Sequence, residues 1–146
     1  MRVRVRRLDA AAQLPRYAHS GPWGDLAADL YACHAATLAP VGQTGSTVAV
    51  GTGIAMELPE SHGALVEDRS GLAVRGVTTL AGVIDPGYRG EVKVVLTNLN
   101  AEPVAIAAGD RIAQLRLVRR LEAAFEEVEE LGEAPRGAGG FGSTGR

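Results

Sequence analysis

Two short segments of the chain carry residues that could activate water and bind an anion. In GVIDPGYRGE, Asp85 ends an apolar run just before a Pro-Gly turn, and Tyr88 follows that turn. An aspartate here often bonds to its own backbone, but the same carboxylate aimed into a cleft could activate water. The Tyr88 ring could pack against a sugar. In EDRSGLA, Arg69 and Ser70 stand at a possible helix start, which suits an anion, with a plain N-cap at Ser70 as the alternative.

Two further polar residues stand in apolar, strand-like segments. Asp29 lies in AADLYA and Gln114 lies in GDRIAQL. Asp29 could be a turn residue, and Gln114 could point to solvent from a strand. The oxygens of Asp29 and Asp85 are also ligands for a hard cation. Because no dense group of such ligands surrounds them, an ion such as Mg²⁺ would arrive largely on a polyphosphate.

The C-terminal segment from Ala134 to Arg146, APRGAGGFGSTGR, is too rich in glycine to form a packed core. Its GAGGFGST stretch resembles a phosphate-binding P-loop, but Ser143 stands where that loop needs lysine, which rejects the P-loop interpretation. Closely approaching glycine amides and the side chains of Arg136, Ser143 and Thr144 could still bind an anion. Phe141 could stack on a base. An inert, disordered end is the alternative.

The elements that must position these residues are expected to be short strands. The 146 residues suit one domain, and 19 glycines with only 4% aromatic residues favour strands and tight turns over a helical bundle. The Pro86-Gly87 pair predicts a type II turn, and residues 69–76 predict one helical turn closed by Gly76. Residues 120–131 fit a helix or a strand and are taken as mainly extended. These short strands and turns predict an antiparallel sandwich, jelly roll or barrel. Single strands are expected over residues 2–8 and 109–118. Two strand pieces are expected within residues 46–59, and two strands joined by the Pro-Gly turn are expected within residues 78–98.

Composition and charge exclude several classes of function. A net charge of −2 provides no broad basic surface for nucleic acid. The single cysteine, Cys33, excludes a disulfide within the chain and favours a reducing, cytoplasmic compartment. No apolar run reaches the roughly 20 residues of a membrane span, and no signal-peptide pattern is present. His19, His34 and His62 lack a metal-motif spacing with Cys33, so zinc is not expected.

Taken together, AADLYA, DRSGLA, GVIDPGYRGE, GDRIAQL and RGAGGFGSTG resemble the five ordered motifs of the trimeric deoxyuridine triphosphatases (dUTPases). The resemblance runs over about residues 21–145. It implies an all-β, jelly-roll-like fold of the β-clip type with one short helix. Residues 1–133 would form this domain, and residues 134–146 a flexible tail that closes over the active site. The resemblance also implies a homotrimer in which each site takes residues from all three subunits.

The resemblance further implies hydrolysis of dUTP to dUMP and pyrophosphate. Asp85 would activate the water that attacks the α-phosphorus, and Mg²⁺ would bridge the phosphates and offset charge on the leaving pyrophosphate. Asp29 would hold the metal through water, and Tyr88 would pack under the deoxyribose. The backbone around Gly82 and Val83 would read uracil. The implied substrate-binding residues are Arg69, Ser70, Gly71, Thr79, Gly82, Val83, Tyr88, Gln114, Arg136, Phe141, Gly142, Ser143 and Thr144.

Three residues depart from the family pattern, and two alternatives accompany it. Ala27 stands where the first motif usually has glycine, Asp68 adds a negative charge beside Arg69, and Thr79 replaces an asparagine that helps read uracil in some relatives. A dCTP deaminase-like or bifunctional enzyme would need a catalytic glutamate where Val95 stands. A non-catalytic nucleotide-binding protein of this fold could dispense with Asp85.

Overall fold

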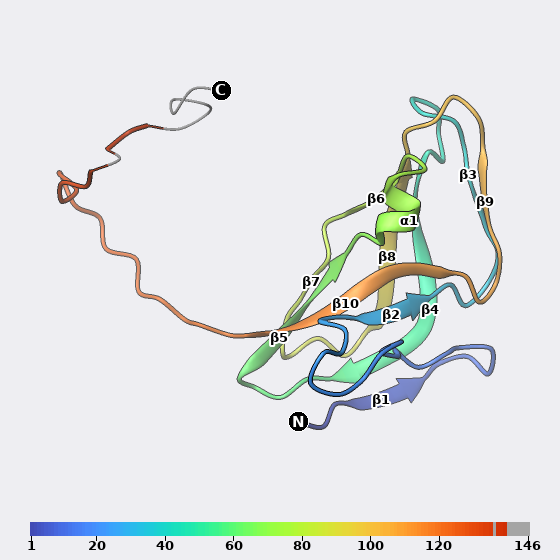
Figure 1. Cartoon of the computed structure of the whole chain (residues 1–146), viewed down its shortest axis with the longest axis horizontal. Coiled ribbons are helices and arrows are strands. Elements are labelled where there is room, and N and C mark those ends of the chain that lie inside the picture. Colours follow the sequence, from blue (N-terminus) through green and yellow to red (C-terminus); the bar gives the residue numbers. More distant parts are fainter. Residues whose placement is uncertain (136, 140–146) are drawn as a thin grey trace.

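The fold is built from two antiparallel sheets and a short two-stranded ladder (Figure 1). The structure is a computed structural model, which describes residues 1–135 and 137–139. The first sheet contains, in order, β1 (Arg4–Arg7), β4 (Thr47–Glu57), β8 (Glu91–Asn98) and β6 (Val77–Leu80). The second contains β2 (Ala28–Tyr31), β10 (Arg111–Arg119), β5 (His62–Glu67) and β7 (Val83–Ile84). The ladder pairs β3 (Ala36–Leu38) with β9 (Val104–Ile106).

Apolar side chains from both sheets form one core, which explains why the strands alternate between buried and exposed positions. In β8, for example, every second residue is buried. The expected antiparallel β-fold is therefore confirmed. The largest fully buried apolar side chains are Leu30, Leu38, Ile54, Leu96, Ile112, Val77, Val92 and Val94.

The segment expected to hold two strand pieces forms one continuous strand, β4. The expected bend is present as a register shift against β8 between Gly51 and Ala55. Gly53 lies in this shift with φ of 68°, a conformation that favours glycine. The prediction of an interruption was right in position, but the strand continues through it because β1 pairs with the residues beyond.

The strand expected before Pro86-Gly87 is broken into β6 and β7, which join different sheets, whereas the strand expected after the turn is β8. β6 pairs with β8 in the first sheet, whereas β7 pairs with β5 in the second. The chain changes sheets at Ala81 and Gly82, whose φ angles are 60° and 111°. The turn itself is confirmed by a Tyr88 N–H bond to the Asp85 carbonyl at 3.1 Å. The type II assignment was wrong, because Gly87 does not have a positive φ.

The part of the chain that the structure describes contains one helix, α1 (Ser70–Ala73). It ends near Gly76, whose φ is 75°, as the sequence predicted. Arg69, not Ser70, occupies the N-cap position, and no side chain caps the helix. The N-cap interpretation of Ser70 was therefore wrong. No helix among the described residues is long and apolar enough to cross a membrane.

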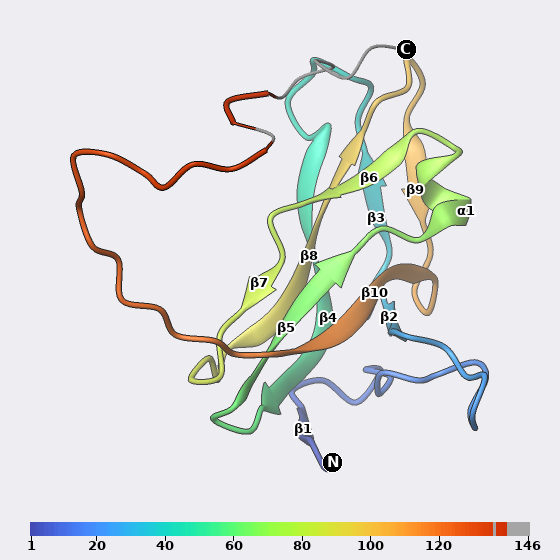
Figure 2. The same ribbon diagram turned by 60° about the vertical axis from the view of Figure 1, so that its left-hand side comes forward.

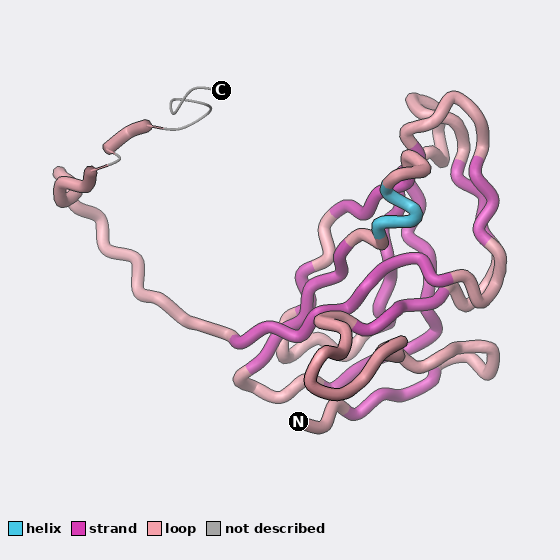
Figure 3. The backbone as a smooth tube through the Cα atoms, viewed as in Figure 1, coloured by secondary structure: helices cyan, strands magenta, loops and turns pink. Residues whose placement is uncertain are grey.

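The chain leaves the two sheets after β10 and runs outward as a long segment without regular secondary structure (Figures 1 to 3). Residues 120–135 belong to neither a helix nor a strand. This segment exposes Leu121, Phe125 and Leu131 by 87%, 99% and 88%. These apolar side chains have no core within one chain to pack against. The predicted boundary at residue 133 stays a prediction.

Candidate active site

Asp29 forms the centre of a charged cluster between β2, β10 and the start of α1. Its carboxylate is nearly buried, at 8% residue exposure. Arg69 Nε donates to Asp29 Oδ1 at 2.9 Å, and Arg111 Nη1 donates to Oδ2 at 3.4 Å. Both carboxylate oxygens are thus occupied by guanidinium groups, and two positive charges face one negative charge. This arrangement holds the arginines in place and leaves their remaining N–H groups able to donate to an anion.

Gln114 lies beside Asp29 on the neighbouring strand, where the two residues are register partners. A cavity of about 330 Å³ opens at this cluster. His19 and Asp25 pair at its edge through Nδ1 and Oδ1, 3.0 Å apart. Hydrogen bonds from the His19 backbone and ring hold the pKa of Asp25 below its usual value. The cavity is lined by Ala18, His19, Asp25, Leu26, Ala27, Asp29, Arg69, Arg111 and Gln114.

Arg111 is a site residue that sequence reasoning missed. Strict alternation in a strand would place Arg111 and Gln114 on opposite faces. The register of β10 against β2 shifts between Arg111 and Ala113, so that Ile112 and Ala113 are both buried. The shift returns Arg111 to the cavity beside Asp29. The one signal in the sequence was the consecutive apolar pair that follows Arg111.

Asp85 lies in a second region, at the turn after β7. The carboxylate is exposed, and the described residues give it neither a hydrogen bond nor an ion pair. The interpretation of Asp85 as a turn aspartate bonded to its own backbone was therefore wrong. Only its backbone carbonyl takes part in the turn, through the bond from Tyr88. A free carboxylate at a cavity edge can accept a proton from water.

Tyr88 folds back from this turn toward β8. Its hydroxyl donates to the Glu91 carbonyl at 2.9 Å. The ring covers Gly90 so closely that a Cβ there would lie 2.6 Å from Tyr88 Cζ. The second cavity, of about 240 Å³, is lined by Val66, Ala81, Gly82, Val83, Ile84, Asp85, Tyr88, Glu91, Val92, Lys93 and Val95.

Three expected phosphate- or base-binding residues line neither cavity. Ser70 and Gly71 are exposed in α1. The Thr79 amide donates to Asp68 Oδ1 at 2.5 Å, and the Thr78 hydroxyl donates to Oδ2 at 2.6 Å. Burial raises the pKa of Asp68, but these bonds outweigh it and hold the pKa below 3.8. Asp68 is thus turned toward β6. It is not among the residues that line the cavity around Arg69 and Arg111, which we call the arginine cavity.

The structure therefore places seven of the predicted site residues at two separate cavities. Asp29, Arg69 and Gln114 line the first cavity, and no residue of that cavity also lines the second. Gly82, Val83, Asp85 and Tyr88 line the second cavity. Arg136, Phe141, Gly142, Ser143 and Thr144 lie outside the described residues.

The described residues thus form an antiparallel β-fold with one cavity lined by two arginines and a separate cavity carrying a free carboxylate. Residues 16–145 match the family model described as dUTPase. The chain is 51% identical over 99% of its length to the deoxyuridine 5'-triphosphate nucleotidohydrolase of Thermobifida fusca (strain YX), covering 79% of that protein. It is 45% identical to the enzyme of that name from Solibacter usitatus (strain Ellin6076), covering 100% and 97% of the two chains. The chain belongs to the dUTPase family.

A solved structure supports the fold assignment independently. A mutant dUTPase of Staphylococcus bacteriophage 80alpha with dUpNHpp superimposes with a TM-score of 0.85 at 24% identity, covering 99% of both chains. A mutant dUTPase from phage phi11 of S. aureus superimposes with a TM-score of 0.78 at 23% identity, covering 89% of this chain and 98% of that one. The latter is described as coordinating a structural Mg(II) ion. These likenesses confirm the jelly-roll-like fold expected from the sequence.

Proposed function

We propose that the protein hydrolyses dUTP to dUMP and pyrophosphate, with Asp85 as the general base. The observation that carries the proposal is the free, exposed Asp85 carboxylate beside the Tyr88 ring and the β7 backbone. An attacking water that bonds to this carboxylate loses its proton as it approaches the α-phosphorus. Two relatives named deoxyuridine 5'-triphosphate nucleotidohydrolase cover almost the whole chain and support the same reaction.

The arginine cavity supplies the phosphate end of the site. Asp29 orients the Arg69 guanidinium through a bond at 2.9 Å, while Arg111 approaches the other carboxylate oxygen. The remaining N–H groups of the two arginines can donate to phosphate oxygens. Gln114 adds an uncharged amide to the same cavity. Ser70 and Gly71, exposed at the start of α1 next to Arg69, would add further donors to the phosphates.

β7 supplies the base-reading part of the site. β7 stands at the edge of its sheet and, among the described residues, pairs only with β5, so the backbone groups on its other side are available to a ligand. Uracil can bond to these groups around Gly82 and Val83, with Thr79 as a further polar contact. Cytosine would leave a donor or acceptor unpaired, which is a strong basis for discrimination. Tyr88 packs under the deoxyribose.

Mg²⁺ fits the site as an ion carried by the phosphates. Each oxygen of Asp29 already accepts a bond from a guanidinium, whose positive charge disfavours a cation coordinated directly to this carboxylate. Asp29 and the Gln114 amide would instead hold the hydrated ion through water, in keeping with the reluctance of Mg²⁺ to lose its waters. When bound, the ion would offset the charge of the triphosphate and of the leaving pyrophosphate.

A homotrimer would bring the two cavities together. One subunit would contribute the Asp29–Arg69 cavity, a second would contribute Asp85, and the tail of the third would close the site. Residues 120–135 run outward with exposed apolar side chains, which suits a segment that packs on a neighbouring subunit. In the tail, Phe141 would stack on uracil, while Arg136, Gly142, Ser143 and Thr144 hold the γ-phosphate.

The chain lacks the glutamate that a dCTP deaminase would need for proton transfer. Val95 lines the Asp85 cavity at the position where that enzyme needs a glutamate, and valine cannot transfer protons. The test of the proposed function is pyrophosphate release from dUTP with Mg²⁺, alongside ammonia release from dCTP. Wild type is compared with Asp85→Asn and with Glu102→Gln, which removes an exposed carboxylate from the segment between β8 and β9. Equal turnover by wild type and Asp85→Asn would refute the assigned role of Asp85.

A further inference from the structure

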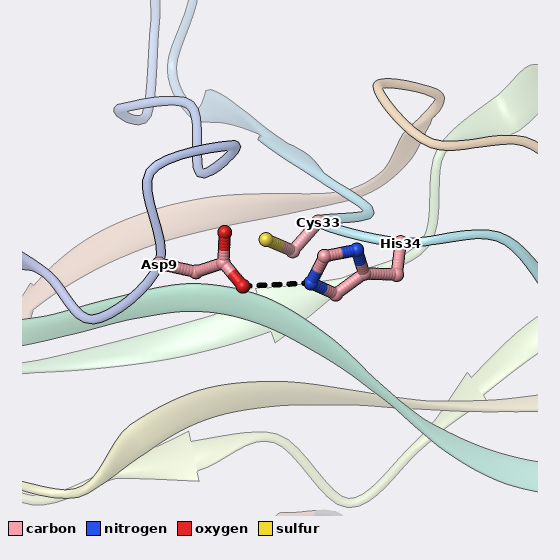
Figure 4. A group of neighbouring side chains, drawn as sticks. All are labelled: Asp9, Cys33 and His34. Atoms are coloured by element: carbon pink, nitrogen blue, oxygen red, sulfur yellow. Dashed lines mark hydrogen bonds and ion pairs between the residues drawn. The ribbon is translucent and has the colours of Figure 1, made fainter.

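A second cluster of reactive side chains lies outside both proposed cavities. Asp9 follows β1, whereas Cys33 and His34 follow β2 (Figure 4). His34 Nε2 lies 2.7 Å from Asp9 Oδ2, and the Cys33 sulfur points toward the same carboxylate. One oxygen, one sulfur and one nitrogen atom from these residues all lie within 4.8 Å of one another. The three ligand types that bind zinc in proteins are therefore gathered at one point.

The turn that carries Asp9 is fixed by the backbone. The Leu8 amide donates to the Gly53 carbonyl at 2.7 Å, which ties the turn to β4. The Ala11 amide donates to Asp9 Oδ1 at 2.8 Å. This bond orients the carboxylate and leaves Oδ2 directed toward His34. Asp9 is thus held in position before any ion binds.

β4 holds the cysteine in position from the other side. The Cys33 amide donates to the Gly51 carbonyl at 2.9 Å, and the Cys33 side chain is buried. Gly53 leaves room for this sulfur, because a Cβ there would lie 2.7 Å from Cys33 Sγ and 3.2 Å from Asp9 Cβ. A cavity of about 380 Å³ borders the cluster and has room for an ion and a water molecule.

We propose that Asp9, Cys33 and His34 bind one Zn²⁺ ion through Oδ2, Sγ and Nε2, with water as the fourth ligand. Thiolate, imidazole and carboxylate together favour Zn²⁺ over a hard ion such as Mg²⁺. Ligand atoms around a tetrahedral zinc ion lie about 3.3–3.6 Å apart. The Asp9–His34 distance of 2.7 Å must therefore lengthen as the ion replaces their hydrogen bond. The exposed His34 ring can make this movement, with its side chain 70% accessible.

The sequence alone predicted no zinc site because these ligands do not form a spaced motif. Cys33 and His34 are adjacent, and Asp9 comes from a segment 25 residues before His34. Only the pairing of β1 with β4 brings the third ligand to the other two. Binding expels the Cys33 thiol proton to solvent, and the His34 ring gives up its Nε2 proton and keeps its proton on Nδ1, so that the Nε2 lone pair can bind the ion. The ion then fastens the turn after β1 to the segment after β2.

The test is calorimetric titration of the full chain with Zn²⁺ after removal of metals. We expect one ion per chain in wild type and in the control His62→Gln, which removes a histidine whose ring bonds to the neighbouring Ser61 hydroxyl. Asp9→Asn, Cys33→Ser and His34→Gln should each weaken binding by more than the roughly 10–100-fold that loss of a second-shell partner costs. Co²⁺ should give a thiolate-to-metal charge-transfer band in wild type and in His62→Gln, and no such band in Cys33→Ser.

Two results would overturn the site. One is Zn²⁺ binding of equal strength in wild type, Asp9→Asn and His34→Gln. The other is the absence of a charge-transfer band in folded wild type saturated with Co²⁺. Circular dichroism shows which variants fold, and His34→Gln keeps the test decisive if Cys33→Ser does not, because the His34 side chain is exposed. Excess Mg²⁺ should leave the bound Zn²⁺ in place.

Discussion

Asp29 and Asp85 are two aspartates in contrasting surroundings. Asp29 is nearly buried, and two arginines occupy both of its oxygens. Asp85 is exposed and has no bonding partner among the described side chains. A carboxylate held by cations can position groups but is poorly placed to accept a proton from water, whereas a free carboxylate can do so. The contrast assigns positioning to the first region and proton transfer to the second.

The strongest test of this contrast between the two aspartates is to neutralise Asp85. Asp85→Asn should lower kcat for dUTP by about 10²–10⁴-fold, the usual contribution of a general base. The melting temperature should change little, because the side chain has no partner to lose. Steady-state kinetics and thermal unfolding of the same preparation check both statements. A large drop in melting temperature would show that Asp85 has a structural role.

Neutralising Asp29 should mainly lower the stability of the fold and weaken substrate binding, whereas neutralising Asp85 mainly lowers kcat. Asp29→Asn leaves the Arg69 and Arg111 guanidiniums without their counter-charge, and we expect a loss of about 2 kcal/mol in the free energy of unfolding. This lies below the roughly 3–5 kcal/mol of a fully buried pair, because Arg111 is half exposed. KM for dUTP should rise as Arg69 loses its orientation. Urea unfolding and kinetics provide the measurements, and an unchanged stability would contradict the structural role.

Gly82 and Gly87 form a matched pair within the Asp85 region. Gly82 has φ of 111°, and a Cβ there would lie 2.6 Å from the Val66 carbonyl oxygen, whereas a Cβ at Gly87 meets nothing within 4 Å. Gly82→Ala should cost about 1–3 kcal/mol in the free energy of unfolding because of this strain. Gly87→Ala should change it by less than about 0.5 kcal/mol. Equal effects in urea unfolding would mean that Gly82 is not required at the sheet change.

The sequence predicted the strands and several residues that line the two cavities, because each of these features depends on local pattern. Alternation in residues 91–98 matches β8, and Gly76 closes the helical turn where expected. Asp29 and Gln114 were identified from their motifs and do line one cavity. These features are decided within a few residues of the chain.

Features that depend on partner choice could not be predicted. Alternation of apolar and polar residues does not show that β6 and β7 join different sheets, because each strand would have the same sequence pattern in either sheet. Arg111 enters the cavity only through a register shift against β2. The Asp9–His34 contact likewise requires two distant segments to fold onto β4. In each case the deciding interaction lies outside the local segment.

The smallest expected effect concerns Asp68, which lies beside Arg69 but bonds to β6. Its pKa in the folded protein is lowered, so its bonds to Thr78 and Thr79 stabilise the fold above the ordinary value of 3.8. That contribution is lost as pH falls through the folded pKa. Wild type should therefore melt above Asp68→Asn at neutral pH, with the difference shrinking in the acid range below 3.8. A difference that stays constant with pH in parallel melting curves would show that these bonds do not depend on the charge of Asp68.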